Sequence, residues 1–307
     1  MHQPHQPAPA PTPAHHDHHD HHDHHGHHAP ATDTDWSALA AFLEREGELN
    51  TPAFAQAAQW LGELVDGASV GRVLDVGSGP GVVAGLLADV FPAAEVVAVD
   101  QSAALLARAE ARSSGRVATQ QADLPAEFGL LGAADLIWSS QAVHHLGDQQ
   151  AALTALAGSL RPGGLLAVAE RGLPLRFLPR DFGLGRPGLQ ARLDAAHEDG
   201  FAAMRAQLPG VIEEVEDWPA MLSRAGLTPA GSRTFLVEWP APLAAPAREH
   251  LYGHLDRRRA QLEESLDAAD LATLDALLDR DAPTGILARP DAFYLAAITV
   301  HTARAEG

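Results

Sequence analysis

The feature that most constrains the fold of this chain is the segment Val73-Leu74-Asp75-Val76-Gly77-Ser78-Gly79-Pro80-Gly81. A short apolar run of β-forming residues passes directly into three alternate glycines, and a helical pattern follows. Glycine is needed where the backbone turns sharply and lies against a ligand with no Cβ in the way. The start of the next helix offers unpaired N–H groups and a partial positive charge. We therefore expect a buried strand, a ligand-binding turn and a helix, in that order.

The chain after this turn continues to alternate between strand and helix patterns. Strands are predicted at residues 72–76, 95–100, 116–121, 134–140 and 165–170. Helices are predicted at 82–90, at 103–112 and from residue 149 onward. Short apolar β-runs that alternate with helices are typical of a parallel, doubly wound α/β sheet with helices on both faces. Residues 70–170 are expected to form this sheet core.

The segments that flank the core follow a looser pattern. N-terminal helices are expected within 35–66, one at 36–46 and a second from Thr51 and Pro52 to about Val65. Residues 171–188 are rich in Gly, Pro and Arg and are predicted to form a loop or lid. Further helices are predicted at 189–208, 217–225, 247–266 and 268–280, and strands at about 231–238 and 292–302. We interpret about 171–230 and 240–290 as a helical cap over the carboxyl edge of the sheet.

Residues 1–34 form a low-complexity tail that holds twelve of the 18 histidines. The tail has almost nothing to bury, so we expect it to be disordered, with one ordered domain at 35–303. Dense imidazoles bind divalent metals, here non-specifically through His15, His16, His18, His19, His21 and His22. We favour a merely solvated tail, because a mobile segment has no fixed groups to orient metal ligands.

Composition excludes several classes of function. The chain has no cysteine and no lysine, which removes thiolate nucleophiles, a phosphate-loop lysine and a Schiff-base lysine. The net charge of −19 repels nucleic acid and anionic lipid. No apolar run approaches the roughly 20 residues that cross a bilayer, and no secretory signal is evident. We expect a cytoplasmic protein with a small-molecule substrate and no nucleic-acid or membrane partner; the oligomeric state is not indicated.

Asp100 closes the apolar strand 95–100, nineteen residues after Gly81. A carboxylate at this position can accept hydrogen bonds from both hydroxyls of a ribose. Two nucleoside cofactors fit these residues. For a dinucleotide, Gly79-x-Gly81-x-x-Ala84 matches the looser fingerprint. For S-adenosylmethionine, the register is Asp75-x-Gly77-x-Gly79-x-Gly81, with an acidic residue inside the strand before the turn.

Three further segments favour S-adenosylmethionine. Asp123 follows the third strand, where a carboxylate can accept the adenine amino group. The fourth strand, 134–140, leads to His144-His145-Leu146, and Leu160-Arg161-Pro162-Gly163-Gly164-Leu165 makes a tight turn into the fifth. Each segment is a weak signal alone, but their joint order and spacing are specific.

With these motifs in order, residues 72–170 resemble a class I S-adenosylmethionine-dependent methyltransferase of the kind that modifies small metabolites. The resemblance implies a Rossmann-like, seven-stranded sheet whose last strand is antiparallel, and the strand at 292–302 fits that place. The chain also resembles an actinobacterial group that shares the stretch at 176–181. The cofactor-binding residues that the resemblance implies are Asp75, Gly77, Ser78, Gly79, Gly81, Asp100, Gln101, Asp123, Leu124 and Ser140.

A methyl group on a sulfonium is already activated, so the enzyme mainly aligns a nucleophile with the S–CH₃ bond and excludes water. A general base is needed only where the acceptor must lose a proton. His144 and His145 are the candidates, just beyond the fourth strand, and we favour His145. Glu170, at the end of the fifth strand, faces the same edge and could orient the substrate or act as the base.

Two other functions remain open from the sequence. An NAD(P)-dependent oxidoreductase would use the same glycine turn and the same carboxylate at Asp100. A metal-binding or sensor protein would use the histidine-rich tail and keep the fold as a scaffold.

Overall fold

The structure is a computed structural model that describes residues 36–65 and 69–307. The tail expected to be disordered, with its metal-binding candidates His15, His16, His18, His19, His21 and His22, lies outside the described residues. Within them, no helix combines the length and apolarity needed to cross a bilayer.

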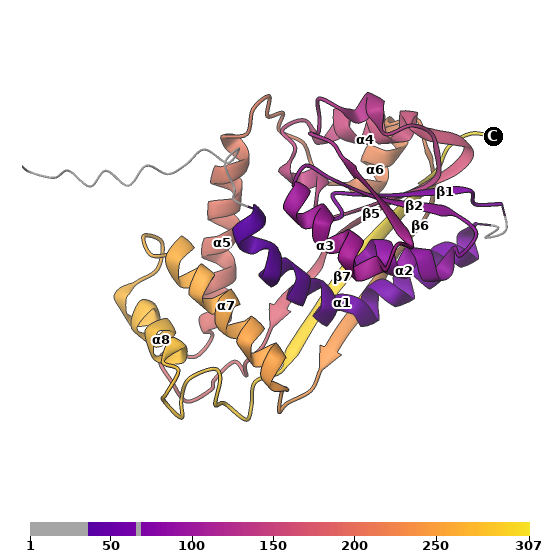
Figure 1. The fold of residues 1–307 in the computed structure, drawn as a ribbon. Helices are drawn as coiled ribbons and strands as arrows, with labels where there is room; N and C mark the ends of the chain where they lie inside the picture. Colours follow the sequence, from indigo (N-terminus) through magenta and orange to yellow (C-terminus); the bar gives the residue numbers. More distant parts are fainter. Residues whose placement is uncertain (1–35, 66–68) are drawn as a thin grey trace, which may run out of the picture.

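One mixed sheet forms the centre of the molecule (Figure 1). Its strands are β1 (Arg72–Val76), β2 (Glu95–Asp100), β3 (Val117–Gln121), β4 (Ala134–Ser140), β5 (Leu160–Arg176), β6 (Thr228–Trp239) and β7 (Tyr294–Arg304). Their order across the sheet is β3-β2-β1-β4-β5-β7-β6. Strands β1 to β5 pair in parallel, and β7 lies antiparallel between β5 and β6. The predicted seven-stranded, doubly wound fold with an antiparallel last strand is confirmed.

Helices cover both faces of the sheet and extend beyond one of its edges. They are α1 (Trp36–Leu64), α2 (Val82–Val90), α3 (Ala103–Ser113), α4 (Gln149–Gly158), α5 (Leu189–Ala206), α6 (Trp218–Arg224), α7 (Ala245–Gln261) and α8 (Ala268–Leu278). Helices α1, α2 and α3 pack on one face, and α4 and α6 pack on the other, which gives two apolar cores. Helices α5, α7 and α8 lie together beyond the sheet and form the cap (Figure 1).

The N-terminal segment is one continuous helix, so the prediction of two helices separated at Thr51 was wrong. Pro52 lies inside α1, although a proline deprives a helix of one N–H donor. The amide of Asn50 and the hydroxyl of Thr51 donate to carbonyl groups one turn earlier, at 3.0 and 3.2 Å. Helix α1 packs closely on α2 before the proline, where a Cβ added to Gly47 would collide with Val82.

The loop or lid predicted at 171–188 begins later than expected. Strand β5 continues to Arg176, because β7 supplies an antiparallel partner as far as Leu295. The pairing shifts register on either side of Leu173, which is how a segment rich in glycine and proline stays in the sheet. Strands β5, β6 and β7 therefore reach past β4 toward the cap helices (Figure 1).

Helix α6 was predicted to be part of the cap and lies instead on a face of the sheet. Its buried side chains, Trp218, Met221 and Leu222, join the apolar core that α4 covers. Asp217 caps its first turn by accepting the N–H of Ala220 at 3.1 Å. Three bulky apolar residues within five positions favour the sheet surface over the more polar cap.

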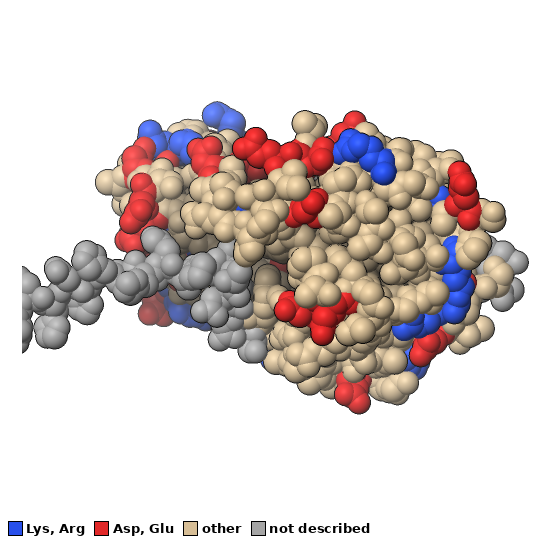
Figure 2. Space-filling view, turned by 90° about the horizontal axis from the view of Figure 1, so that it is seen from above, with Lys and Arg blue, Asp and Glu red and all other residues tan. Residues whose placement is uncertain are grey.

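Charge is spread rather than gathered on one face of the molecule. On the face that Figure 2 shows, acidic and basic side chains stand singly or in small groups among uncharged ones. Many arginines are paired with carboxylates, as Arg108 and Arg112 of α3 are with Glu44 of α1.

Replacing Gly81 by Ala should lower the free energy of unfolding by about 2–4 kcal/mol, measured by urea denaturation. Gly81 has a φ of +74°, and a Cβ there would collide with Ala109 of α3. The matched control is Gly85→Ala in α2, where a Cβ meets nothing within 4 Å. This change should stabilise the protein by about 0.4–1 kcal/mol. Equal effects of the two substitutions would contradict the close packing of the turn.

Candidate cofactor and acceptor site

The glycine turn lies at the carboxyl end of β1 and leads into α2. The N–H groups of Gly77 and Ser78 both donate to the carbonyl of Val99 in β2, at 2.9 and 3.0 Å. Gly79 has a φ of +54°, and a Cβ added there would meet no atom within 4 Å. The backbone at Gly79 is therefore open on the side where a ligand would lie against it.

Asp100, the last residue of β2, is held against this turn. Its Oδ2 accepts the N–H of Gly79 at 2.9 Å, and its Oδ1 accepts the N–H of Ser102 at 2.9 Å. Burial raises the pKa of Asp100, while these two N–H groups oppose the rise. The structure thus brings the predicted ribose-binding carboxylate and the glycine turn together. Gln101, also a predicted cofactor residue, is exposed, and its carbonyl accepts the amide of Gln121 at 2.9 Å.

Asp75 lies inside β1 just before the turn and is 2% exposed. Among the described residues, its Oδ2 has no hydrogen-bond partner, and neither has the buried hydroxyl of Ser78. Burial raises the pKa of Asp75 to about 7, and the charge of Asp100 adds to the rise. Two buried acceptors without donors, beside an open turn, fit a ligand that brings N–H or O–H groups to this place.

Asp123 and Leu124, predicted to contact the adenine, follow β3. Asp123 is exposed, and its contacts are backbone ones: its N–H donates to Glu127 Oε2 at 2.7 Å, and its carbonyl accepts the N–H of Glu127 at 2.9 Å. Leu124 is partly buried against the core under α4. Within the described chain, no hydrogen bond or ion pair connects the Asp123 carboxylate to the glycine turn.

The catalytic candidates meet just beyond the end of β4, beside the middle of β5. His144 and Glu170 are both buried, and His144 Nδ1 lies 2.9 Å from Glu170 Oε2. The other carboxylate oxygen of Glu170 is buried and has no partner among the described residues. Ser140 ends β4 and is partly buried. A paired imidazole and carboxylate can bind or move a proton at this edge.

His145 has different surroundings from His144. The ring of His145 is exposed and meets Trp36 edge-on, with centroids 5.7 Å apart. The two imidazoles lie 4.2 Å apart, in a 3₁₀ turn from Val143 to His145. The structure therefore pairs Glu170 with His144 and not with the favoured candidate.

Several residues of this site escaped the sequence analysis. Gln141 has a φ of +52°, an uncommon conformation for a residue other than glycine, directly after β4. Phe201 of α5 packs 5.5 Å from the ring of His144, and Arg205 donates to the carbonyl of His144. The spacing of Phe201 and Arg205 on one helix face was a usable signal, but their partner His144, in the turn after β4, could not be identified from the sequence.

The described residues contain no group of three or more His, Asp or Glu side chains placed to hold a metal ion. The site combines the open turn at Gly79 with the carboxylates of Asp75 and Asp100 at the ends of β1 and β2. The buried imidazole of His144 lies just beyond the end of β4. Adjacent carboxyl ends of parallel strands are where nucleoside cofactors bind in such sheets.

Residues 73–164 match the family described as a methyltransferase domain. The chain is 34% identical to a trans-aconitate 2-methyltransferase of Methylobacterium nodulans over 63% of this chain and 69% of that protein. It is 30% identical to one from Paracidovorax citrulli, over 67% of this chain and 78% of the relative. With one from Deinococcus radiodurans the identity is 40%, but the match spans 36% of that protein's length.

A solved structure with a similar fold is the Haemonchus contortus phosphoethanolamine N-methyltransferase 2, at 16% identity and a TM-score of 0.41. It matches 77% of this chain and 49% of that one. The long matches to the Methylobacterium and Paracidovorax proteins, together with the domain match, establish the family. The chain belongs to the class I S-adenosylmethionine-dependent methyltransferases.

Proposed function

We propose that this methyltransferase transfers a methyl group to a hydroxyl oxygen of a small organic acid. The observation that carries the proposal is the buried pair of His144 and Glu170, 2.9 Å apart at the carboxyl edge of the sheet. A hydroxyl must lose its proton as it is methylated, and a neutral imidazole held by a carboxylate accepts such a proton well. The relatives named for trans-aconitate support an organic acid as the acceptor.

The cofactor roles that we propose follow from the groups around the turn. Asp100 would accept the ribose hydroxyls, and Asp75, with its unpartnered Oδ2, would accept donors of the methionine portion. When bound, S-adenosylmethionine supplies an activated methyl group whose leaving group is a neutral thioether. The roles of Gly77, Gly81, Gln101, Asp123, Leu124 and Ser140 stay predictions, as do the cytoplasmic location and the actinobacterial resemblance.

For the acceptor we propose that His144 and not His145 is the base. We take His144 in the tautomer whose Nδ1–H donates to Glu170, which leaves the Nε2 lone pair for the proton of the acceptor hydroxyl. Phe201 and the buried surroundings keep water from this imidazole. Methylation of a carboxylate oxygen, which needs no base, is the second candidate, favoured by the names of the relatives. The unpartnered oxygen of Glu170 would repel a carboxylate nucleophile, and so we prefer a hydroxyl.

Asp100→Ala should abolish binding of S-adenosylmethionine and S-adenosylhomocysteine, because the substitution removes both the ribose acceptor and the bond that shapes the turn. Isothermal titration calorimetry of the wild-type protein should show heat with these two ligands and none with NAD or NADP. Preferential binding of NAD would overturn the assignment of the cofactor.

His144→Gln should lower kcat by about 10²–10⁴-fold with a hydroxyl acceptor and leave the affinity for S-adenosylhomocysteine unchanged. The matched control is His145→Gln, which should lower kcat less than tenfold because the imidazole that Glu170 holds is that of His144. The assay is formation of S-adenosylhomocysteine, with acceptors found by screening small hydroxy acids. A larger loss in the His145 variant would contradict the assignment of the base.

Asp75→Asn should change how stability depends on pH in the ligand-free protein. Burial raises the pKa of Asp75 from its ordinary value of 3.8 to about 7 in the folded state, so the wild-type protein loses stability as the pH rises from about 4 to about 7. Asparagine carries no charge, and so the variant should be the more stable at pH 8, by up to about 4 kcal/mol, and have no such advantage at pH 4. Urea denaturation between pH 4 and pH 8 measures the free energy of unfolding of both proteins. If the two free energies change with pH in the same way, Asp75 is not a buried charge.

A further inference from the structure

Helix α5 of the cap ends beside the turn that carries His144. Arg205, in the last turn of α5, donates through Nη1 to the carbonyl of His144 and to the carbonyl of Leu146, the latter at 3.3 Å. Its Nη2 reaches the carbonyl of Gly147 at 3.5 Å. One guanidinium of the cap thus binds three backbone carbonyls of the segment that follows β4.

The turn itself cannot provide donors for these carbonyls. Val143–His145 is a single 3₁₀ turn, and its own hydrogen bonds end with the N–H of Leu146, which donates to the carbonyl of Val143 at 3.0 Å. The carbonyls at the C-terminal end of such a turn have no partner inside it. A planar guanidinium carries donors in a fixed fork and a positive charge, which is favourable at a C-terminal end. Arg205 therefore caps this turn from a different element.

The loop after α5 packs against the same segment. The N–H of Ile212 donates to the carbonyl of Gly147 at 3.1 Å. A Cβ added to Gly147 would lie 2.2 Å from the carbonyl oxygen of Pro209. Such close packing leaves the segment little room to shift toward the loop. The end of α5 and the loop that follows it therefore hold the turn in one place.

The same helix also contacts the imidazole. Phe201 meets the ring of His144 edge-on, with centroids 5.5 Å apart and an interplanar angle of 70°. Phe201 and Arg205 are four residues apart and so share a face of α5. One side chain packs on the ring, and the other binds the backbone of the same residue. The place of the imidazole is therefore determined from two sides, by Glu170 of β5 and by α5.

The contacts of Arg205 are unlike those of a neighbouring arginine. Within residues 36–65 and 69–307, every hydrogen bond of Arg205 goes to a carbonyl of the segment after β4. Arg224 of α6 binds side chains instead, Glu214 at 2.6 Å and Gln150 at 3.0 Å. Arg224 is therefore a matched control for Arg205.

We propose that Arg205 is a positioning residue, which holds His144 in the orientation that Glu170 fixes at the ring. This inference rests on the proposed function, because it takes His144 as the base. Arg205 acts through the carbonyl of His144 and not through contact with the acceptor. Without it the turn and the imidazole are free to move, and a misplacement of about 1 Å lowers the rate about 10²-fold.

The first test follows the Nδ1 proton of His144 in the proton NMR spectrum of the ligand-free protein. A buried ring N–H that is bound to a carboxylate exchanges slowly with water and gives a signal downfield of the amide protons. His144→Gln identifies this signal by removing it. Arg205→Ala should broaden or remove the signal well below the melting temperature, and Arg205→Lys should keep part of it, because an ammonium replaces some of the donors. Arg224→Ala should leave it unchanged.

The second test is a double-mutant cycle in kcat, measured with the hydroxy acid that the acceptor screen identifies. Arg205→Ala should lower kcat about 10²-fold and leave the KM of the acceptor and the affinity for S-adenosylhomocysteine nearly unchanged. In the His144→Gln background the same substitution should cause no further loss, because no base remains to be oriented. Guanidinium chloride at low concentration should restore part of the kcat of Arg205→Ala, and sodium chloride at equal ionic strength should not.

The outcomes separate this inference from the proposed function. If His144→Gln removes no downfield signal, or leaves kcat unchanged, the assignment of the base fails and this inference fails with it. If His144 behaves as the base but Arg205→Ala keeps the signal, or loses the same factor in both backgrounds, the positioning role is wrong and the base stands. Thermal melting checks that every variant is folded, and Arg205→Lys serves for the same comparisons if Arg205→Ala does not fold.

Discussion

The hydrogen bond between the Asp100 carboxylate and the N–H of Gly79 joins the two parts on which the site depends. It holds the turn after β1 against the end of β2, while Val99 accepts two further N–H groups of the same turn. Close packing reinforces it, because Gly81 lies against Ala109 with no room for a side chain. The result is a turn with an open backbone at Gly79 and a carboxylate fixed beside it.

The antiparallel strand β7 determines how far the sheet extends beyond the candidate site. By pairing with β5 as far as Arg176, it carries the sheet beyond Glu170 and supports the cap. The pair of His144 and Glu170 lies on the core side of this extension, and a small cavity lined by residues of α5 and α7 lies at its far end. The extended strands thus connect the candidate site at the end of β4 with the cap.

The sequence was a good guide wherever a local pattern determined the structure. Alternate glycines, apolar runs and caps such as Asp148 located strands β1 to β4 and helices α2 to α4 closely. It was a poor guide where a distant segment decided the outcome. Pro52 stays in a helix that packs along α2, residues 171–176 stay in the sheet because β7 pairs with them, and α6 joins the core under α4.

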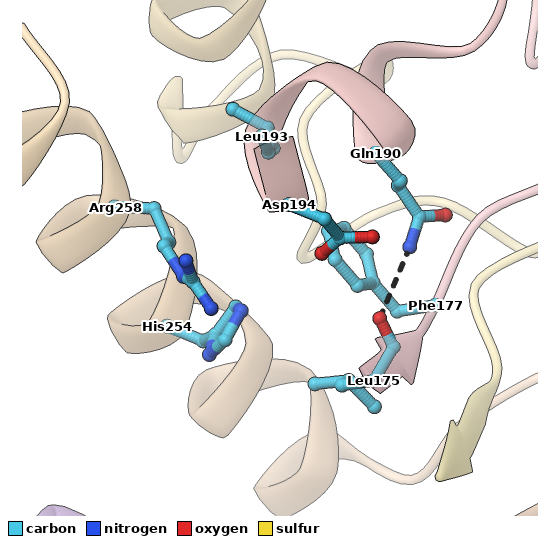
Figure 3. Close-up of a pocket in the computed structure, with 7 residues that line it drawn as sticks. All are labelled: Leu175, Phe177, Gln190, Leu193, Asp194, His254 and Arg258. Atoms are coloured by element: carbon cyan, nitrogen blue, oxygen red, sulfur yellow. Dashed lines mark hydrogen bonds between the residues drawn. The ribbon is translucent and has the colours of Figure 1, made fainter. Parts of the chain in front are cut away.

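The residues of the candidate site also differ in whether a local pattern or a distant segment determines their place. Asp75 and Asp100 were identifiable because their place relative to the glycines is fixed by the chain itself. His144 and His145 were not distinguishable, since side chains of neighbouring residues in a 3₁₀ turn diverge by about 120°. Only the fold shows which of them meets Glu170. A small cavity in the cap is lined by Leu175 of β5, Asp194 of α5 and His254 of α7 (Figure 3). No sequence pattern connects those three segments.

Helix α1 connects the cap to the sheet. Its first half stacks Phe42 on His250 of the cap, and its second half packs Trp60 against Phe235 of the sheet. Between these two contacts lies Pro52, which provides no N–H donor, so the helix lacks one backbone hydrogen bond there. A displacement of the cap relative to the sheet would have to break one of the ring contacts or bend α1, and a helix bends most readily at a proline.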